Sequence, residues 1–246
     1  MFSFFTKKHF LIDDLDGFID IHNHILPGID DGAKSVEDAI ELIKCFGEFG
    51  VKDFICTPHI MENYYPNNPN TITKSLALLQ NGLKMSNLDH INIQAAAEHM
   101  IDSGFEKLVD ENNIMPLSKS YILIEMSYLQ ASINFNNAID KIKEKGLFPI
   151  FAHPERYSYF HYSLGEYKKL KNKGLLFQLN LLSLGDYYGS DVQKIAKSLL
   201  NNNLIDFAAS DVHKLSQLEN LKKISLDTKT IKNLKPILEK TIYNFK

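Results

Sequence analysis

This sequence of 246 residues has few cysteines, a single arginine and no long apolar run. The two cysteines, Cys45 and Cys56, stand in apolar stretches, and so sparse a pair does not build the disulfide framework of a secreted protein. No segment approaches the apolar length of a membrane span. The N-terminal MFSFFTKKHFLIDDL places its aromatic patch before its lysines, the reverse of a signal peptide. We therefore expect a cytoplasmic protein without membrane insertion.

Charge and length fit an ordinary globular protein. The net charge of −3 gives no reason to expect a polyanionic partner, so nucleic acid is not predicted. The length exceeds that of most single domains, but α/β barrels commonly reach it as one unit. We expect a single domain over residues 1–246, of which residues 1–16 form an N-terminal extension.

Short apolar runs, each followed by a helical pattern, repeat along nearly the whole chain. GFIDIHNH precedes the helix-periodic SVEDAIELIKCFGEFG, for which Ser35 is the expected N-cap. Further strands are predicted at KDFICTPH, INIQAAAEH, YILIEMS, FPIFAHPER, LLFQLNLLSL and LIDFAASDVH, the last before a C-terminal helix. These seven strand-then-helix units predict an α/β fold with a parallel sheet. Repetition without a Gly-rich phosphate loop favours a barrel.

Residues that can bind a metal stand at the ends of six of the seven predicted strands; only LLFQLNLLSL lacks one. His22 and His24 are two residues apart, so a strand would present both imidazoles on one face. The carboxyl ends of parallel strands converge on one mouth, where such residues would meet. The candidate ligands are His22, His24, Asp31, His59, Glu98, Glu125, His153, Asp211 and His213.

The chemistry of this set indicates catalysis. Imidazole with carboxylate suits Zn, Mn or Fe rather than Ca, and cysteine, the usual ligand of structural zinc, is absent from the strand ends. The nine candidates are too many for one ion and enough for two or three ions that share a bridging carboxylate. Because multi-metal sites clamp both the attacking and the leaving oxygen of a phosphoester, hydrolysis is our first hypothesis.

Arg156, the only arginine, stands three residues after His153 in AHPERY. A guanidinium fork binds phosphate oxygens in a bidentate way that lysine cannot reproduce. An ion pair with a nearby acid such as Glu155 or Asp186 is the structural alternative. The nearness of Arg156 to the candidate ligands favours the phosphate role.

Six segments, taken together and in order, resemble the PHP (polymerase and histidinol phosphatase) superfamily: DIHNHILPGIDDGAKS, CTPH, AAAEH, LIEM, FAHPERY and AASDVH. Within it, the chain is similar from about Phe18 to His213 to the bacterial manganese-dependent tyrosine phosphatases of the CpsB/YwqE type, which regulate capsule and exopolysaccharide synthesis. HILPGIDDGA and HPERY carry far more of this resemblance than His-x-His alone. The resemblance implies a distorted (β/α)7 TIM-like barrel with a trinuclear site.

The resemblance also implies how the ligands divide among the ions, with Mn²⁺ as the metal and Fe or Zn left open. One group would hold each ion: His22, His24, Glu98 and Asp211; Glu98, Glu125 and His153; and Asp31, His59 and His213. The implied substrate is a phosphotyrosine-bearing tail of a cognate bacterial tyrosine kinase. A metal-bound hydroxide would attack phosphorus in line, while Arg156 and the ions take up charge on the equatorial oxygens.

One departure from the family pattern concerns phosphate recognition. Members often carry a second arginine shortly after the last Asp-x-His, where this chain reads HKLSQLEN with only Lys214. Lysine supplies charge but not the fork. Tyrosines that could grip a phosphotyrosine ring are predicted on the loops at the mouth, at Tyr64, Tyr65, Tyr157, Tyr187 and Tyr188.

Rival functions differ in their chemistry. A cysteine-dependent tyrosine phosphatase needs an arginine six residues after its cysteine, and here those positions are Val51 and Glu62, which excludes it. A small-molecule phosphatase such as histidinol phosphatase would use the same metals. A metal-dependent amidohydrolase commonly uses a carbamylated lysine where this chain has Glu125. A catalytically idle binding module would not need every ligand, and the oligomeric state is left open.

Overall fold

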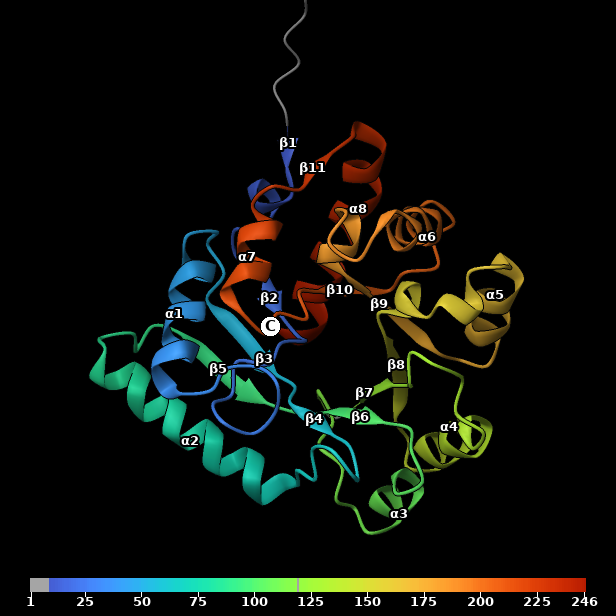
Figure 1. Ribbon diagram of the computed structural model, residues 1–246, viewed down its shortest axis with the longest axis horizontal. Helices are drawn as coiled ribbons and strands as arrows, with labels where there is room; N and C mark the ends of the chain where they lie inside the picture. Colours follow the sequence, from blue (N-terminus) through green and yellow to red (C-terminus); the bar gives the residue numbers. More distant parts are fainter. Residues whose placement is uncertain (1–8, 119) are drawn as a thin grey trace, which may run out of the picture.

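In the computed structural model, which describes residues 9–118 and 120–246, strands lie at the centre and helices surround them (Figure 1). Every predicted strand-then-helix unit is present. The strands are β1 (His9–Phe10), β2 (Ile19–Asp20), β3 (Asp53–Cys56), β4 (His59–Ile60), β5 (Asn92–Ala95), β6 (Glu98–Met100), β7 (Tyr121–Glu125), β8 (Phe148–Ala152), β9 (Leu176–Asn180), β10 (Phe207–Ala209) and β11 (Ser225–Leu226).

The helices alternate with the strands along the chain, and α1 begins as predicted, because the Ser35 hydroxyl accepts a hydrogen bond from the Asp38 backbone N–H. They are α1 (Val36–Gly47), α2 (Pro69–Met85), α3 (Phe105–Asp110), α4 (Phe135–Glu144), α5 (Leu164–Asn172), α6 (Ser190–Asn201), α7 (Leu215–Leu221) and α8 (Thr228–Phe245). Short 3-10 turns are η1 (Leu11–Asp14), η2 (Pro154–Arg156), η3 (Ser158–Phe160) and η4 (Leu181–Leu184).

Parallel pairing organises the central strands into two sheets, in the orders β10-β9-β8-β7-β6-β4 and β2-β3-β5. Two of the predicted strands are interrupted: KDFICTPH forms β3 and β4, and INIQAAAEH forms β5 and β6, with the halves in different sheets. The fold is therefore mixed α/β with parallel sheets.

The first and last units of the series lie side by side. A parallel bridge joins Asn23 to Val212, and the Asp211 backbone N–H donates to the His22 carbonyl at 2.7 Å. Below this bridge the Asp20 carboxylate accepts hydrogen bonds from the backbone and the hydroxyl of Ser210. Segments about 190 positions apart in sequence are thus joined where the candidate ligands stand.

Apolar side chains fill both faces of the central strands, as expected of parallel strands covered by helices. On β7, Ile122 and Ile124 belong to the large cluster packed against the helices, and Leu123 belongs to a second cluster. That second cluster, the inner cluster, draws on strands of both sheets: Ile19, Ile21, Ile55, Ala96, Leu117, Leu123, Ile150, Ala152, Phe207 and Ala209.

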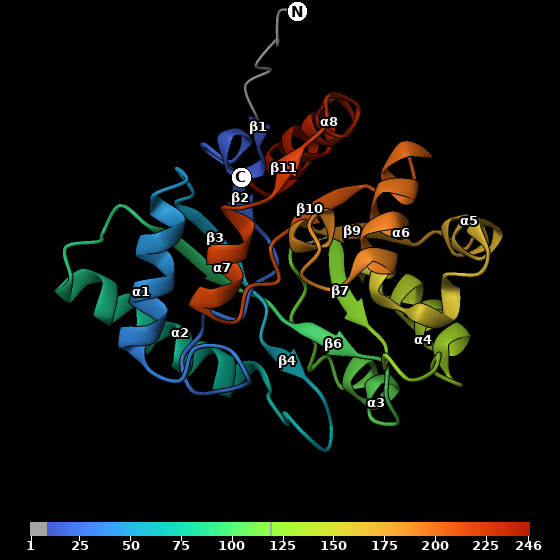
Figure 2. The same ribbon diagram turned by 45° about the horizontal axis from the view of Figure 1, so that its top comes forward.

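The C-terminal segment differs from the prediction of a single helix, because β11 separates α7 from α8. β11 pairs antiparallel with β1, and Figure 2 shows α8 beside this pair. Residues 1–8 of the predicted N-terminal extension lie outside the described residues. Residues 9–16 include β1 and η1, and they bury Leu11 and Leu15 in the core.

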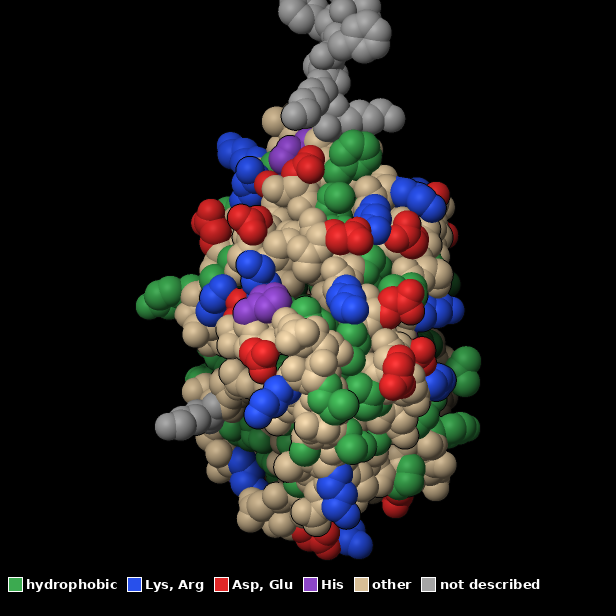
Figure 3. Space-filling model, turned by 90° about the vertical axis from the view of Figure 1, so that its left-hand side faces the viewer, with side chains coloured by type: hydrophobic (Ala, Val, Ile, Leu, Met, Phe, Trp, Pro, Cys, Tyr) green, Lys and Arg blue, Asp and Glu red, His purple; other side chains and the backbone are tan. Residues whose placement is uncertain are grey.

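Three features of the structure agree with the expectations from composition: the state of the cysteines, the mixture of charges on the surface and the length of the apolar helices. Cys45 and Cys56 are buried and do not form a disulfide. On the face that carries α1 and α2, lysine and acidic side chains are interspersed with apolar ones (Figure 3). Across the described ranges, no helix has both the length and the apolar character needed to cross a membrane.

Truncation of the inner cluster tests its contribution to stability. Replacing the fully buried Leu123 by alanine should lower the free energy of unfolding by about 2–5 kcal/mol, because lost transfer energy and a residual cavity add. Urea denaturation measures this change. Leu78→Ala, at an exposed position of α2, is the matched control and should shift stability by less than about 1 kcal/mol. Equal effects at both positions would contradict the assignment of Leu123 to the core.

Candidate metal centre

Nine side chains of ligand type meet at the carboxyl ends of the strands, and they are the nine that the sequence singled out. They form three overlapping groups in which the ligand atoms lie within 4.8 Å of one another. The groups are His22, Glu98, His153 and Asp211; His24, Asp31, His59 and His213; and His59, Glu98 and Glu125.

Three of the carboxylates follow residues of the inner cluster, and strand alternation explains this for Glu125. Glu98, Glu125 and Asp211 each stand two residues after a member of the inner cluster, namely Ala96, Leu123 and Ala209. On β7, Glu125 points to the same face as Leu123, because every second residue of a strand does so. Ala96 lies in the break between β5 and β6, and Asp211 lies beyond the end of β10, so contacts between segments place Glu98 and Asp211. The apolar cluster therefore forms the floor beneath the polar one.

Glu98 lies at the centre of the assembly and is fully buried. Its Oε2 lies 3.2 Å from His22 Nε2 and 3.0 Å from His59 Nδ1, and its Oε1 lies 3.1 Å from His153 Nε2. It belongs to two of the three groups. Glu98 is therefore a ligand that two ions could share.

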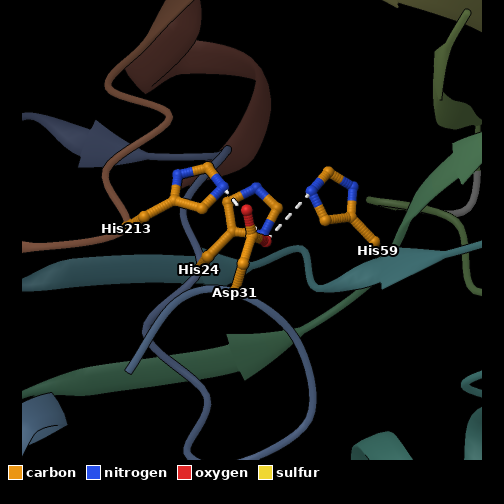
Figure 4. Close-up of side chains that lie close together, drawn as sticks. All are labelled: His24, Asp31, His59 and His213. Carbon is orange, nitrogen blue, oxygen red and sulfur yellow. Dashed lines mark ion pairs between the residues drawn. The ribbon is translucent and has the colours of Figure 1, made fainter. Parts of the chain in front are cut away.

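The outer group stands closest to solvent. In Figure 4 the Asp31 carboxylate lies between His59 and His213, with His24 beside it. Asp31 Oδ1 is 3.5 Å from the Nε2 atoms of both His59 and His213. The Asp31 side chain is 51% exposed, whereas Asp211 in the inner group is 2% exposed. The groups therefore extend from the floor of the site to its mouth.

Grouping by distance differs in three members from the division that the family resemblance implies, since His59 also falls with Glu98 and Glu125. His24 falls with Asp31, His59 and His213, and His153 falls with His22, Glu98 and Asp211. His24 Nε2 still lies 3.3 Å from Asp211 Oδ1, so it stands between two groups. The assignment of each residue to one ion stays a prediction.

The residues present suit metal ions. Four buried ligand-type atoms make no hydrogen bond: His153 Nδ1, and His59 Nδ1, Glu98 Oε2 and Glu125 Oε1, of which His59 Nδ1 lies 3.0 Å from the Glu98 oxygen and 2.8 Å from the Glu125 oxygen without hydrogen-bond geometry. Buried polar atoms are normally hydrogen-bonded, so several orphans within one cluster need another partner. Nitrogen and carboxylate oxygen donors without sulfur match Mn, Fe or Zn.

Mutual charge compensation shifts the pKa values of the cluster. Burial raises the pKa of Glu98, but His22 and His59 outweigh it and hold that pKa well below its usual range. Burial lowers the pKa of His59, yet the carboxylates of Glu125 and Glu98 raise it well above the ordinary value. At the mouth, burial and the neighbouring His24 lower the pKa of His213 to about 4. Carboxylates are thus kept ionised at the centre of the site.

Two ligand candidates have an unusual backbone conformation. His153 has φ of 35° and Asp211 has φ of 53°, in the left-handed region. In the described parts of the chain, the other non-glycine residues with positive φ are Asn87, Asn112 and Asn203. Asparagine, aspartate and histidine are the non-glycine residues that most often adopt this region, and two of the five stand at the candidate site.

Two residues that orient the imidazoles were missed by the sequence reasoning. Asp30 Oδ2 lies 2.8 Å from His24 Nδ1, and Gln178 Oε1 lies 2.8 Å from His22 Nδ1. Gln178 Nε2 donates to the Leu179 carbonyl, which leaves Oε1 toward His22, where it can only accept. His22 Nδ1 therefore carries a proton, which turns Nε2 toward the carboxylates of Glu98 and Asp211.

The strand without a ligand thus contributes orienting groups. Gln178 lies on β9, and Asn180 at its end donates through Nδ2 to Asp211 Oδ2 at 2.9 Å. The signal that could have identified them is their polar character in an otherwise apolar strand.

Arg156 contacts a ligand candidate, and neither of the nearby acids considered above. Its Nη1 donates to Asp211 Oδ2 at 2.6 Å. Its guanidinium carbon lies 4.7 Å from the centre of the Tyr128 ring and 4.2 Å from that of Tyr188. Two aromatic faces thus fix the plane of the fork, and Asp211 uses one N–H donor of its five.

A cavity of about 1260 Å³ opens above the cluster and is lined by Arg156 and six of the ligand candidates. Tyr64 and Tyr65 line it, and the Tyr65 ring stacks on His59 at 5.4 Å. The predicted place of Tyr157 at the rim is wrong, because its ring is buried against Phe151. Tyr128, which was not predicted, lies at the cavity wall instead.

Removing the group that orients His22 tests this arrangement. Gln178→Leu should weaken Mn²⁺ binding by about 10- to 100-fold, because His22 Nδ1 loses the acceptor that fixes its tautomer. Titration of the metal-free protein with Mn²⁺ against a chelating dye measures the affinity. Gln94→Leu, at an exposed position of β5, is the matched control and should bind like the wild type. Unchanged affinity in Gln178→Leu would contradict the orienting role.

Comparison with known proteins agrees with the family resemblance seen in the sequence. The family described as capsular polysaccharide synthesis, CpsB/CapC, matches residues 18–227. CapC of Staphylococcus aureus is 30% identical over 229 residues, which cover 93% of this chain and 89% of that protein. The tyrosine-protein phosphatase YwqE of Bacillus subtilis is 30% identical over 196 residues, covering 79% and 77%.

A solved structure extends the likeness to three dimensions. It comes from work on YwqE of Bacillus subtilis and CpsB of Streptococcus pneumoniae, which are described as metal-dependent tyrosine phosphatases. It superposes with a TM-score of 0.78 at 26% identity and covers 93% of this chain and 95% of the other. On the family match and the similarity to CapC, this chain belongs to the CpsB/CapC family of capsular polysaccharide synthesis proteins.

Proposed function

We propose that this chain hydrolyses phosphotyrosine in a protein substrate, using two or three metal ions held by the nine clustered residues. The observation that carries the proposal is the meeting of those ligand-type side chains with the Arg156 guanidinium at the floor of one cavity. It is supported by the tyrosine-phosphatase names of the relatives YwqE and CpsB.

The architecture that we propose is a single domain over residues 1–246, with residues 1–16 as an N-terminal extension, folded as a distorted (β/α)7 TIM-like barrel of the PHP type. Interrupted β3–β4 and β5–β6 would each count as one strand. The backbone bonds between the segments after β2 and β10 support closure of the ring, and the inner cluster supports a filled interior.

Mn²⁺ is the ion that we propose, with Fe or Zn as alternatives, because the donors are imidazole and carboxylate. Bound ions would supply a water of lowered pKa and positive charge beside the phosphoryl oxygens. Glu98, which belongs to two of the three groups, would help to hold more than one ion. Asp30 and Gln178 would hold His24 and His22 in the required tautomers.

Arg156 would bind the transferred phosphoryl group. Burial lowers its pKa, but Tyr128 and Asp211 raise it, so the guanidinium stays charged. Lys214, which stands where family members often carry a second arginine, is exposed and is not among the residues that line the cavity. Phosphate recognition would therefore fall to Arg156 and the ions. The phenol, with a pKa of about 10, leaves without a dedicated acid.

The partner that we propose is the phosphotyrosine-bearing tail of a bacterial tyrosine kinase of capsule or exopolysaccharide synthesis, met in the cytoplasm. The family's role in capsular polysaccharide synthesis supports this, and the size of the cavity suits an aromatic side chain presented by another protein. Neither nucleic acid nor membrane insertion forms part of the proposal.

Phosphate release from two esters tests the activity. With Mn²⁺ present, the protein should hydrolyse a phosphotyrosine peptide faster than histidinol phosphate, and a chelator should abolish both rates. His22→Ala is the inactive control, because it removes a ligand from the inner group. A preference for histidinol phosphate would keep the metal site and contradict the tyrosine phosphatase. Absence of phosphate release from both esters would contradict phosphoester hydrolysis.

Replacing Arg156 tests its role in phosphate binding. Arg156→Lys should lower kcat/KM for the phosphotyrosine peptide by about 10- to 100-fold, the effect of losing one charge-assisted hydrogen bond. Bound metal, measured by elemental analysis, should remain at the wild-type level. Lys214→Ala is the matched control and should leave kcat/KM unchanged. Wild-type kinetics in Arg156→Lys would assign Arg156 a purely structural pairing with Asp211.

A further inference from the structure

Large apolar side chains are exposed at the rim of the cavity. Of the nine that are exposed in the described ranges, four line this cavity: Tyr64, Tyr128, Leu129 and Ile133. Leu129 is 92% and Ile133 is 99% exposed. Single exposed apolar residues are ordinary, but a group around one opening indicates a binding surface.

The loop that carries Leu129 and Ile133 is held in place by hydrogen bonds. Between β7 and α4, the Ser132 hydroxyl donates to the Ile101 carbonyl at 2.6 Å, and Tyr159 donates to the Ser127 carbonyl at 2.9 Å. Asn134 Nδ2 donates to the Asp102 carbonyl at 2.9 Å. The backbone is thus anchored on both sides of two aliphatic side chains that remain in solvent.

The same loop is continuous with the phosphate-binding end of the cavity. The Tyr128 hydroxyl lies 3.4 Å from His153 Nε2, and its ring packs on the Arg156 guanidinium. Leu129 follows directly in sequence. A phosphotyrosine that reaches Arg156 would therefore bring its chain neighbours to the wall that Leu129 and Ile133 form.

Charge on the cavity wall limits what those neighbours can be. Asp102 and Glu106 line the same side, and Asp31 stands at the mouth. Among the described residues that line the cavity, Arg156 is the only lysine or arginine. An acidic residue beside the phosphotyrosine would meet these carboxylates and no free lysine or arginine, whereas an apolar residue would bury Leu129 and Ile133.

We propose that Leu129 and Ile133 form a subsite that selects protein substrates with an apolar residue next to the phosphotyrosine. This proposal rests on the proposed phosphatase activity and adds its sequence preference. The occupant is an apolar side chain of the substrate itself, since the subsite opens into the cavity that holds Arg156.

Three phosphotyrosine peptides that differ only in the residues flanking the phosphotyrosine, which are leucine, glycine or glutamate, test the subsite. The wild type should show a kcat/KM about tenfold higher for the leucine peptide than for the glycine peptide, the scale of partly burying one aliphatic side chain. The glutamate peptide should be the poorest. The double variant Leu129→Ser with Ile133→Ser should have the same kcat/KM for the leucine and glycine peptides. Its kcat/KM for the glycine peptide should equal that of the wild type.

Leu78→Ser with Met85→Ser, two exposed positions of α2 on another face, is the matched control and should keep the wild-type preference. A wild type without preference for leucine, or a double variant that loses equally on both peptides, would overturn the subsite. Hydrolysis of free phosphotyrosine by every variant separates this failure from failure of the phosphatase activity. Light scattering gives a further check. If the wild type is a dimer and the double variant is a monomer, the proposal is overturned, because a second copy of the chain would then occupy the surface.

Discussion

Burial of opposite charge around Glu98 is the constraint on which the rest of the structure depends. A carboxylate withdrawn from water is strongly destabilising unless it is paired. Here three imidazoles, those of His22, His59 and His153, surround it at 3.0–3.2 Å. These imidazoles come from separate segments of the chain, so the compensation exists only when the strands are aligned. The fold therefore depends on the pairing within the site, just as the site depends on the fold.

The residues around the cluster orient its side chains rather than add charge to it. Asp30 and Gln178 select which imidazole nitrogen faces inward, and Asn180 ties Asp211 to the end of β9. Two tyrosine rings hold the Arg156 guanidinium in one plane. Each constraint removes rotamer freedom that a ligand would otherwise have to remove on binding, which is the basis of preorganised recognition.

The sequence predicted the repeating units and the nine clustering residues well because both follow from local pattern. Apolar runs identify strands, and a polar residue at the end of a parallel strand has one place to go. What it could not predict depends on contacts between distant segments. Asp211 lies 55 positions from Arg156, and no local rule chooses it over the adjacent Glu155. The breaks within β3–β4 and β5–β6, the separation of α7 from α8 and the buried place of Tyr157 likewise come from tertiary packing.

The pairing of the segments after β2 and β10 has a consequence for the order of events during synthesis. Asn23 leaves the ribosome long before Val212, its partner in the bridge. Until then His22 lacks Asp211, and the early strands have no neighbour on one side. Chains generally begin to fold from the N-terminal end as they emerge, yet this one completes its centre only when the segment after β10 has been made. A chain that stops before residue 211 would lack Asp211 and His213, two of the nine clustered side chains, so an intact centre also indicates that synthesis has passed residue 213.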